Sequence, residues 1–331
     1  VKFTKDGSTV MTAAVKLARA YTGRDYIAMC SASPFFSYDD WFIGRTAINA
    51  GIPQAHKSLS LQFDYNDIES LQKLFDEYPG QIACVAMEPA RAIEPEPGYL
   101  QQVQALCNRY GAVFLLDETI TGFRWHKHGA QHLYGVTPDL SCFGKAMGNG
   151  FAISALAGKR DLMRLGGLHH TDAQRVLLLS TTHGAESPSL GAAIEVMKIY
   201  QREPVVEHLH RAGERLRAGI ETITESLGLS EYFQLSGRGC AVMYTTLDEH
   251  GEASQSMRTL FLQQMLRHGI LPTSFLTSYS HTDEDIDKTI EAAGKSLLVY
   301  KQALAQGVER FLVGRPSASV YRPYNEARTG N

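Results

Sequence analysis

The sequence predicts an α/β protein with a mostly parallel central sheet, helices on both faces, and a smaller C-terminal α+β domain. Three observations predict this class. The chain has 331 residues, 44% hydrophobic and 20% charged, which is enough for a sizeable core and two domains. Short apolar runs alternate with helical patterns, as in parallel sheets covered on both faces. Beyond about residue 205, longer helical patterns and two separate strand-like runs replace this alternation.

The first part of the chain contains the alternating elements. The helical pattern of residues 9–22 ends at Gly23, a residue that commonly ends helices. Residues 35–56 contain aromatic residues and glycines without a clear period, and we expect a loop there. The other elements, in chain order, are a strand at 25–30, a helix at 67–78, a strand at 82–87, a helix at 98–111, and strands at 112–117, 139–144 and 151–158.

Helical patterns from about residue 187 to 228, at 189–200 and then 205–228, lie on either side of the domain boundary that we expect near residue 205. Two strands and two helices follow, at 232–237, 241–247, 255–268 and 283–307. The end of the chain is polar. We therefore expect a large domain at 1–204, a small C-terminal domain at 205–312 and an extended tail at 313–331.

The composition argues against several classes of protein. The net charge is −3, and no block of basic residues is interleaved with aromatic ones, which argues against nucleic-acid and anionic-membrane partners. Five scattered cysteines without a C-x-x-C pair argue against a disulfide framework or zinc site and favour a reducing, cytoplasmic location. No apolar run approaches the roughly 18 residues that span a bilayer. Because the chain opens with "VKFTKDGSTV", we expect preceding residues to be missing from this numbering.

Three groups capable of chemistry follow predicted strands. Glu88 follows the strand at 82–87, Asp117 ends "AVFLLD", and Lys145 follows "DLSCFG". In parallel sheets, ligands bind beyond the carboxyl ends of the strands. A salt bridge between Asp117 and Lys145 with no further role is the alternative interpretation.

A fourth feature is the "KDGSTV" stretch before the first helix. Gly7 and Ser8 stand where backbone N–H groups and the helix dipole favour an anion such as phosphate, although this pair is also an ordinary N-cap. The dinucleotide and Walker fingerprints are absent from the sequence. An anion cradle, a strand-end carboxylate and a strand-end amine together suggest pyridoxal 5'-phosphate. This cofactor needs a lysine for its aldehyde, an acid beside its ring nitrogen, and an anchor for its phosphate.

Three segments carry a resemblance to a known family. "LLDETITGFR", "FGKAMGNG" and "STTHGAESPSLGAA" resemble the aspartate, lysine and phosphate-threonine segments of class III aminotransferases, in the same order. Within that class, "VKLARAYTGRD" and "HTDEDIDKTIEAA" resemble the glutamate-1-semialdehyde 2,1-aminomutase branch. The resemblance covers residue 1 to about residue 305. It implies a pyridoxal-phosphate enzyme of fold type I that interconverts an amine and a carbonyl.

The resemblance also implies roles for single residues. Lys145 would form the Schiff base and shuttle a proton, with its pKa lowered by an apolar pocket and the nearby pyridinium. Asp117 would bond the ring nitrogen, and backbone N–H groups of Gly7 and Ser8 would hold the phosphate. Thr181, or Thr182 if the register slips by one, would reach the phosphate of a neighbouring subunit, which implies a homodimer with shared active sites.

Four further positions complete the expected site. Phe35, with Phe36 as the alternative, would stack on the cofactor ring. Thr119 would meet the other face, where the family usually has an apolar residue, and Glu88 would support the site from behind. Packing in the core is the competing interpretation for each. We expect no metal site at "WHKH" (residues 125–128), because its histidines lack a helix-spaced ligand partner.

The substrate is left open by the sequence. The aminomutase branch carries a glutamate-containing gate, whereas "LPTSFLTSYSHTDED" here is shorter and lacks that glutamate. We therefore expect a transaminase of a specialised biosynthetic pathway, acting on an amino sugar or amino acid, with an aminomutase as the alternative. A non-catalytic binding or scaffold protein of the same fold is a third hypothesis. The presence of both Asp117 and Lys145 argues against it.

Overall fold

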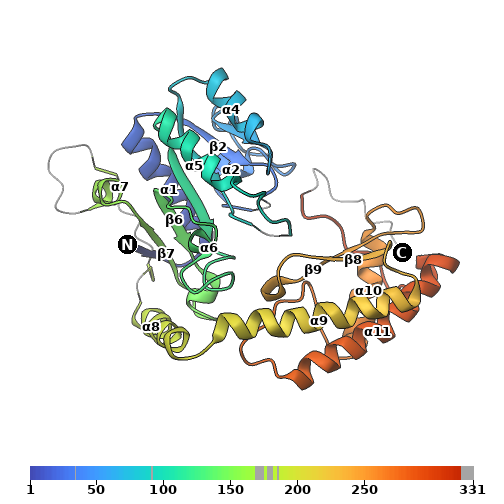
Figure 1. Ribbon diagram of the computed structural model, residues 1–331. Coiled ribbons are helices and arrows are strands. Elements are labelled where there is room, and N and C mark those ends of the chain that lie inside the picture. Colours follow the sequence, from blue (N-terminus) through green and yellow to red (C-terminus); the bar gives the residue numbers. More distant parts are fainter. Residues whose placement is uncertain (34, 91, 168–174, 177–181, 185, 322–331) are drawn as a thin grey trace. The chain divides into compact units, whose positions relative to one another are not determined.

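The computed structural model describes residues 1–33, 35–90, 92–167, 175–176, 182–184 and 186–321 (Figure 1). Residue contacts divide the chain into two compact units. Unit 1 comprises Val1–Ala90, Pro95–Glu203 and Tyr321–Asn331, and unit 2 comprises Arg91–Glu94 and Pro204–Val320. We propose that these units are the large and small domains.

A seven-stranded sheet with the order β1-β7-β6-β5-β4-β2-β3 forms the centre of unit 1. Strands β2 to β6 pair in parallel, while β7 is antiparallel to β6 and to β1. The predicted mostly parallel sheet is therefore confirmed. The strands are β1 (Lys2–Thr4), β2 (Tyr26–Cys30), β3 (Ser60–Phe63), β4 (Ile82–Met87), β5 (Val113–Glu118), β6 (Leu140–Phe143) and β7 (Ser154–Gly158).

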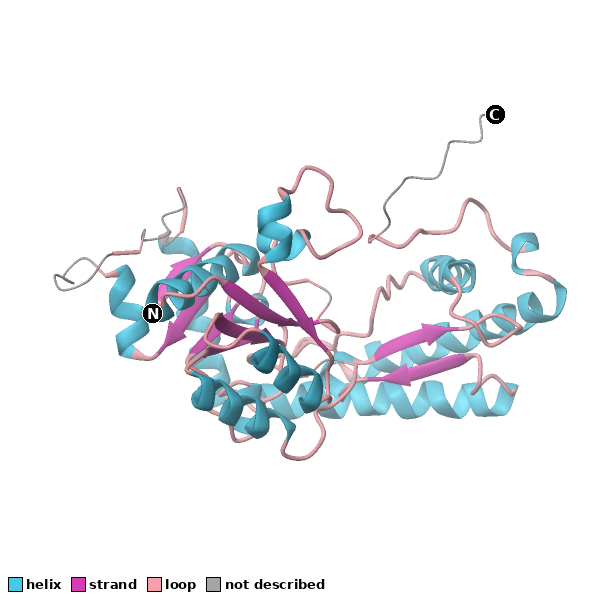
Figure 2. Cartoon of the chain, turned by 90° about the horizontal axis from the view of Figure 1, so that it is seen from above, coloured by secondary structure: helices cyan, strands magenta, loops and turns pink. Residues whose placement is uncertain are grey.

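Helices cover both faces of this sheet (Figure 2). Strand β5 illustrates the arrangement, because successive side chains point to opposite faces. Its residues Val113 and Leu115 pack in the cluster that contains α1 (Gly7–Thr22). Phe114 and Leu116 belong to a second cluster, formed with α4 (Ile68–Glu77) and α5 (Tyr99–Tyr110). A strand that is buried on both faces has no polar side, which explains its continuous apolar run.

Helix α1 begins and ends at clear sequence signals. The carboxylate of Asp6 accepts hydrogen bonds from the backbone N–H of Thr9, at 2.8 Å, and from its hydroxyl. Gly23 ends the helix in the left-handed conformation, with φ at 66°. The apolar residues between these ends are almost all buried, so α1 fixes the position of its own first turn against the sheet.

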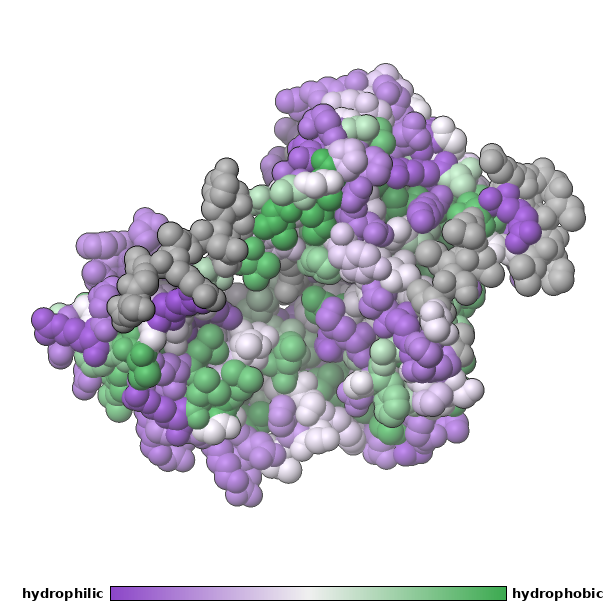
Figure 3. Space-filling model, turned by 180° about the vertical axis from the view of Figure 1, so that it is seen from behind, coloured by the Kyte–Doolittle hydropathy of each residue, from purple (hydrophilic) through white to green (hydrophobic). Residues whose placement is uncertain are grey.

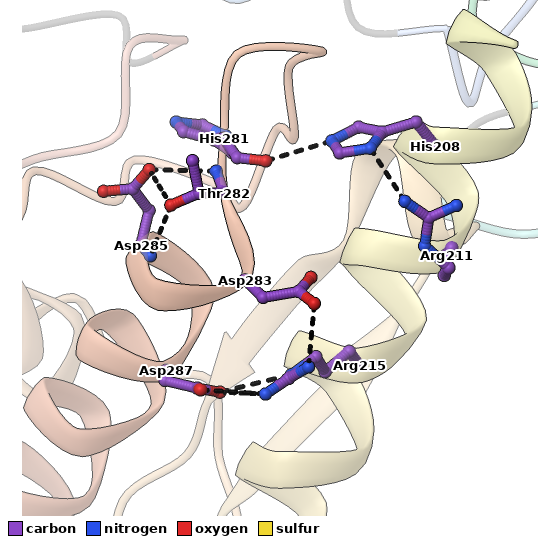
Figure 4. A network of polar contacts seen from close by, with 8 residues as sticks. All are labelled: His208, Arg211, Arg215, His281, Thr282, Asp283, Asp285 and Asp287. Atoms are coloured by element: carbon purple, nitrogen blue, oxygen red, sulfur yellow. Dashed lines mark hydrogen bonds and ion pairs between the residues drawn. The ribbon is translucent and has the colours of Figure 1, made fainter.

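Unit 2 contains a separate two-stranded sheet and three long helices. Strands β8 (Phe233–Ser236) and β9 (Met243–Thr246) pair antiparallel, and a core of their apolar residues packs with α9, α10 and α11. A polar network joins α9 to the start of α11: Arg215 forms ion pairs with Asp283 and Asp287, and His208 contacts the backbone oxygen of His281 (Figure 4). The helices are α9 (Val205–Leu227), α10 (Gln255–Arg267) and α11 (Asp283–Gln306).

Several short elements of the structure were not predicted from the sequence. Strands β1 and β3 lie at the two edges of the large sheet, where strands are short and carry a weak apolar pattern. The expected loop at 35–56 contains the short helix α2 (Asp40–Ile43), and a second short helix, α3 (Gln54–Ser58), begins within it. One turn of helix is too short to show a period of 3.6 residues. Among the residues that the structure describes, no helix is long and apolar enough to cross a membrane.

Candidate active site

The predicted acidic residues lie at neighbouring strand ends. Asp117, which is 4% exposed, pairs with Cys142 in the register of β5 and β6. Met87 pairs with Leu116, so continuing the register of β4 and β5 by one step places Glu88 beside Asp117. Burial raises the pKa of the Cys142 thiol, and the nearby Asp117 raises it further. The neighbour of Asp117 is therefore a neutral thiol at physiological pH.

Lys145 lies just beyond the end of β6. It stands three residues after Cys142, the pairing partner of Asp117, so the Cα atoms of Lys145 and Asp117 are separated by at most roughly 16 Å. The backbone of Lys145 has a φ of 39°, a left-handed conformation that costs about 1–2 kcal/mol for a residue other than glycine. Such strain is concentrated at functional sites.

The side chain of Lys145 is exposed. An apolar pocket around this amine is expected from the resemblance, and that pocket stays a prediction. The neighbouring Ala146 and Met147 are buried.

The start of α1 presents backbone donors. The first N–H groups of a helix have no acceptor within the helix. Asp6 accepts from Thr9 through its side chain and from Val10 through its backbone oxygen. The hydrogen bonds of the described residues include none from the backbone N–H groups of Gly7 and Ser8. These two donors fit an anion, although the carboxylate of Asp6 lowers the positive potential at this helix end.

Thr119 brings the start of α1 together with the end of β6. A Cβ atom on Gly7 would lie 3.2 Å from Cγ2 of Thr119, and one on Gly144 would lie 3.0 Å from the same methyl group. A Cβ on Gly144 would also lie 2.8 Å from Oγ of Ser154. Larger residues than glycine would therefore crowd this space. Ser154 and Gly144 were not among the predicted site residues, because neither carries a group that signals chemistry in a sequence.

The hydroxyl of Thr119 is buried, and no described residue forms a hydrogen bond with its Oγ1 atom. Thr119 is 7% exposed, and its backbone N–H donates to Oδ1 of Asp117 at 2.9 Å. Leaving a buried hydroxyl without a partner costs about 1–3 kcal/mol. An orphaned donor between Gly7 and Gly144 is typical of a place that a ligand fills.

The two candidate aromatic residues have different environments. Phe36 is 1% exposed and packs in the core, stacked with Trp41 at 6.3 Å between ring centroids. Phe35 is 47% exposed and touches Phe42 edge-to-face. Only the exposed ring is accessible to a ligand, so this environment favours Phe35.

Thr181 lies outside the described residues. The alternative, Thr182, is exposed, as is His183 after it. Farther along, Glu186 forms an ion pair with Lys5, which precedes α1 by two residues, and a weaker one with His183 at 3.8 Å. These ion pairs connect the segment after Thr181 to the start of α1.

Glu118 is a buried carboxyl that was not among the predicted site residues. It accepts hydrogen bonds from the hydroxyl of Thr121 and from the backbone N–H groups of Ala130 and Gln131, at 2.7–2.8 Å. A Cβ atom added to Gly129 would lie only 2.8 Å from Oε1 of Glu118, so the carboxylate packs closely against this glycine. Burial raises the pKa of Glu118 above its ordinary value. Glu118 thus connects the end of β5 to the backbone at Ala130 and Gln131 through hydrogen bonds.

Trp125 and a histidine cluster lie in the same loop region. Nε1 of Trp125 is buried and has no hydrogen-bond partner among the described residues. The rings of His126 and His132 stack at 4.4 Å, and His128 lies 5.3 Å from His126. In the described ranges, no group of three or more histidine, cysteine, aspartate or glutamate side chains is arranged to hold a metal ion.

Comparison with known proteins identifies the family. The family model described as "Aminotransferase class-III" matches residues 2–297. The chain belongs to the class III aminotransferases. It is therefore a pyridoxal-phosphate-dependent enzyme of amino transfer, as the sequence segments predicted.

Relatives of this class III aminotransferase include two kinds of enzyme. The chain is 33% identical to 3-aminobutyryl-CoA aminotransferase from Cloacimonas acidaminovorans, over 91% of this chain and 71% of that protein. It is 31% identical to glutamate-1-semialdehyde 2,1-aminomutase from Haloquadratum walsbyi, over 92% and 76%. Among solved structures, the internal-aldimine form of the FumI protein from Sphingopyxis sp. MTA144, with bound PLP, has a TM-score of 0.81 at 26% identity, covering 92% of this chain and 72% of that chain. The predicted fold type I is therefore confirmed.

The residues present fit pyridoxal phosphate. The backbone donors of Gly7 and Ser8 suit a phosphate, and the glycines at 7 and 144 leave room beside Thr119. Asp117 is a buried carboxylate suited to a protonated ring nitrogen, and Lys145 is an amine that solvent can reach. Because the orphaned hydroxyl of Thr119 lies in the same space, the set of donors matches an anionic ligand with a polar ring.

Proposed function

We propose that the enzyme is a transaminase that uses Lys145 and Asp117 as its catalytic residues. The observation that carries this proposal is their placement at the ends of paired strands β6 and β5. When bound, pyridoxal phosphate supplies an aldehyde that condenses with amines and a ring that accepts electrons from the adjacent carbon.

Each residue of the site has a separate task in this proposal. Lys145 would hold the cofactor through its amine, and the same amine would then carry one proton between the substrate and the cofactor. Asp117 would keep the ring nitrogen protonated, because an ion pair of this kind is worth roughly 4 kcal/mol at a separation of about 4 Å under an effective dielectric near 20. The N–H groups of Gly7 and Ser8 hold the phosphate.

The faces of the ring are assigned to two further residues. Phe35, the exposed aromatic of the pair, would stack on one face, and Thr119 would meet the other. Glu88, beside Asp117 in the strand register, supports that carboxylate from the adjacent strand.

A spectroscopic titration tests this arrangement: wild type acquires a visible band when the cofactor is added, whereas Lys145→Ala shows only free cofactor. Identical spectra would contradict the proposal.

We infer that amino transfer takes place between two molecules rather than within one. The absence of the glutamate-containing gate from "LPTSFLTSYSHTDED" supports a transaminase, and a specialised biosynthetic pathway acting on an amino sugar or amino acid fits best. The relatives include both types of enzyme, so an aminomutase is the second candidate. A panel of amino donors, followed in single turnovers by the visible band, separates the two. Reaction with a separate donor supports the transaminase, while turnover of the semialdehyde alone supports the mutase.

A homodimer with shared active sites is part of the proposal. Unit 1 exposes the apolar side chains of Phe151, Ile194 and Met197, and hydrophobic residues interrupt the hydrophilic surface on the face drawn in Figure 3. Thr181, which lies between these positions in the sequence, would then reach the cofactor of the partner. Mixing inactive Lys145→Ala and Thr181→Ala variants tests this arrangement, because mixed dimers restore one intact site.

A cytoplasmic location is supported by five cysteines that are all free and buried.

A further inference from the structure

The methyl group of Thr119 lies close to both Gly7 and Gly144. A Cβ atom added to Gly7 would have Cγ2 of Thr119 as its nearest neighbour, at 3.2 Å. A Cβ atom added to Gly144 would lie 3.0 Å from the same Cγ2, and only Oγ of Ser154 would be nearer. The backbone N–H of Thr119 is bonded to Asp117, so the main chain is fixed. The methyl group of Thr119 therefore occupies space that a side chain at position 7 or 144 would crowd.

Packing alone does not account for that hydroxyl. Valine has the same shape as threonine and would fill the same space with a methyl group in place of Oγ1. Threonine instead places a polar atom inside the protein, where no described residue accepts a hydrogen bond from it. A buried donor is destabilising without an acceptor. A bound group beside Thr119 that carries an acceptor oxygen would satisfy this donor.

We propose that Thr119 is a positioning residue whose hydroxyl donates a hydrogen bond to an anionic oxygen of bound pyridoxal phosphate. This inference rests on the proposed function. Two kinds of oxygen share the required chemistry: a phosphate oxygen, favoured by the nearby Gly7 (3.5 Å from its Cβ position to Oγ1), and the ring oxygen. In either case, the hydroxyl orients the cofactor relative to Asp117 and Lys145.

Two substitutions separate the hydroxyl from the methyl group. Thr119→Val keeps the shape and removes the donor, while Thr119→Ser keeps the donor and removes the methyl group. Thr222→Val is the matched control, because the hydroxyl of Thr222 donates to the backbone oxygen of Ala218 in its own helix. Each full-length variant is titrated with the cofactor, and its melting temperature is measured without it.

We expect Thr119→Val to bind the cofactor about tenfold more weakly than wild type, the effect of one lost hydrogen bond. Its melting temperature without cofactor should equal or exceed that of wild type, because the orphaned hydroxyl is gone. Thr119→Ser should bind with nearly the affinity of wild type and melt at a lower temperature. If Thr119 had only a structural role, Thr119→Val would melt at a lower temperature than wild type.

Spectroscopy on the loaded variant identifies the acceptor. A changed ³¹P chemical shift in Thr119→Val indicates the phosphate, and a displaced visible band indicates the ring oxygen; either result supports the proposal. Wild-type affinity in Thr119→Val, with both signals unchanged, would overturn it. That outcome leaves the proposed function standing, whereas wild type that fails to bind the cofactor through Lys145 would refute the proposed function itself.

Discussion

The backbone N–H of Thr119 donates a hydrogen bond to Oδ1 of Asp117, 2.9 Å away, in a buried turn at the end of β5. The turn therefore orients the carboxylate before any ligand arrives. An acid that is already oriented loses little conformational entropy on binding, which is the basis of preorganised sites. The same turn places Thr119 beside the first residue of α1.

Replacing Asp117 with asparagine should abolish most activity without unfolding the protein. Asparagine keeps an oxygen for the N–H of Thr119 but carries no charge for the ring nitrogen. Losing an interaction of about 4 kcal/mol corresponds to roughly a thousandfold decrease in rate. Steady-state kinetics and thermal melting check this prediction. Asp161→Asn, at an exposed carboxylate, is the control and should retain both activity and stability; comparable activity in the two variants would refute the role of Asp117.

Phe35 and Phe36 should respond to alanine in opposite ways. Phe36→Ala should lower the free energy of unfolding by about 3–5 kcal/mol, because it empties a site in the core. Phe35→Ala should leave stability almost unchanged and weaken cofactor binding by roughly three- to tenfold, since an aromatic contact is worth about 0.5–1.5 kcal/mol. Denaturant unfolding and cofactor titration on both variants distinguish them. If only Phe36→Ala changed the affinity of the folded protein, the stacking residue would be Phe36.

Gly144→Ala should weaken cofactor binding by at least about tenfold, the equivalent of 1.4 kcal/mol. Its Cβ would stand 2.8 Å from Oγ of Ser154 and 3.0 Å from the methyl group of Thr119, so both must move. Gly314→Ala is the matched control, because nothing lies within 4 Å of its Cβ position. Cofactor titration and melting of the two variants test the prediction. Equal affinities would show that the space beside Thr119 has no part in binding.

The fold was predictable because its main signals are local. The fully apolar runs of β4, β5 and β6 predicted buried parallel strands, and Gly23 predicted the end of α1. Asp117 and Lys145 were predictable because their chemical groups stand at strand ends. Gly144, Ser154 and Glu118 were not, because their importance depends on contacts between strands and loops that the sequence does not display. The choice between Phe35 and Phe36 likewise depends on how deeply each side chain is buried, which the sequence does not display.

The stability contributed by Glu118 should depend on pH. Burial raises its pKa in the folded chain above the ordinary value of 4.5, so the folded state holds its proton more tightly than the unfolded state. Its contribution is therefore fully present below pH 4.5 and is lost as the pH rises through the folded pKa. Glu118→Gln lacks this titration, and at neutral pH it should cost about 1–3 kcal/mol, because an amide NH₂ would face a backbone N–H.

Tryptophan fluorescence can follow this effect in unit 1 alone, since both tryptophans, Trp41 and Trp125, belong to that unit. The difference in unfolding free energy between wild type and Glu118→Gln should be largest at and below pH 4.5 and become smaller as the pH rises. A difference that grows with pH would show that the folded protein prefers the carboxylate, contrary to the direction of the pKa shift.

The central claim is that Lys145 bonds the cofactor, and peptide mapping after chemical reduction tests it most directly. The protein is incubated with pyridoxal phosphate, reduced with borohydride, digested and analysed by tandem mass spectrometry, alongside a Lys145→Arg variant. We predict a single dominant pyridoxyl-modified residue, Lys145, and no comparable labelling of the variant. A modification that falls on another lysine, or is equally strong in Lys145→Arg, would contradict the account.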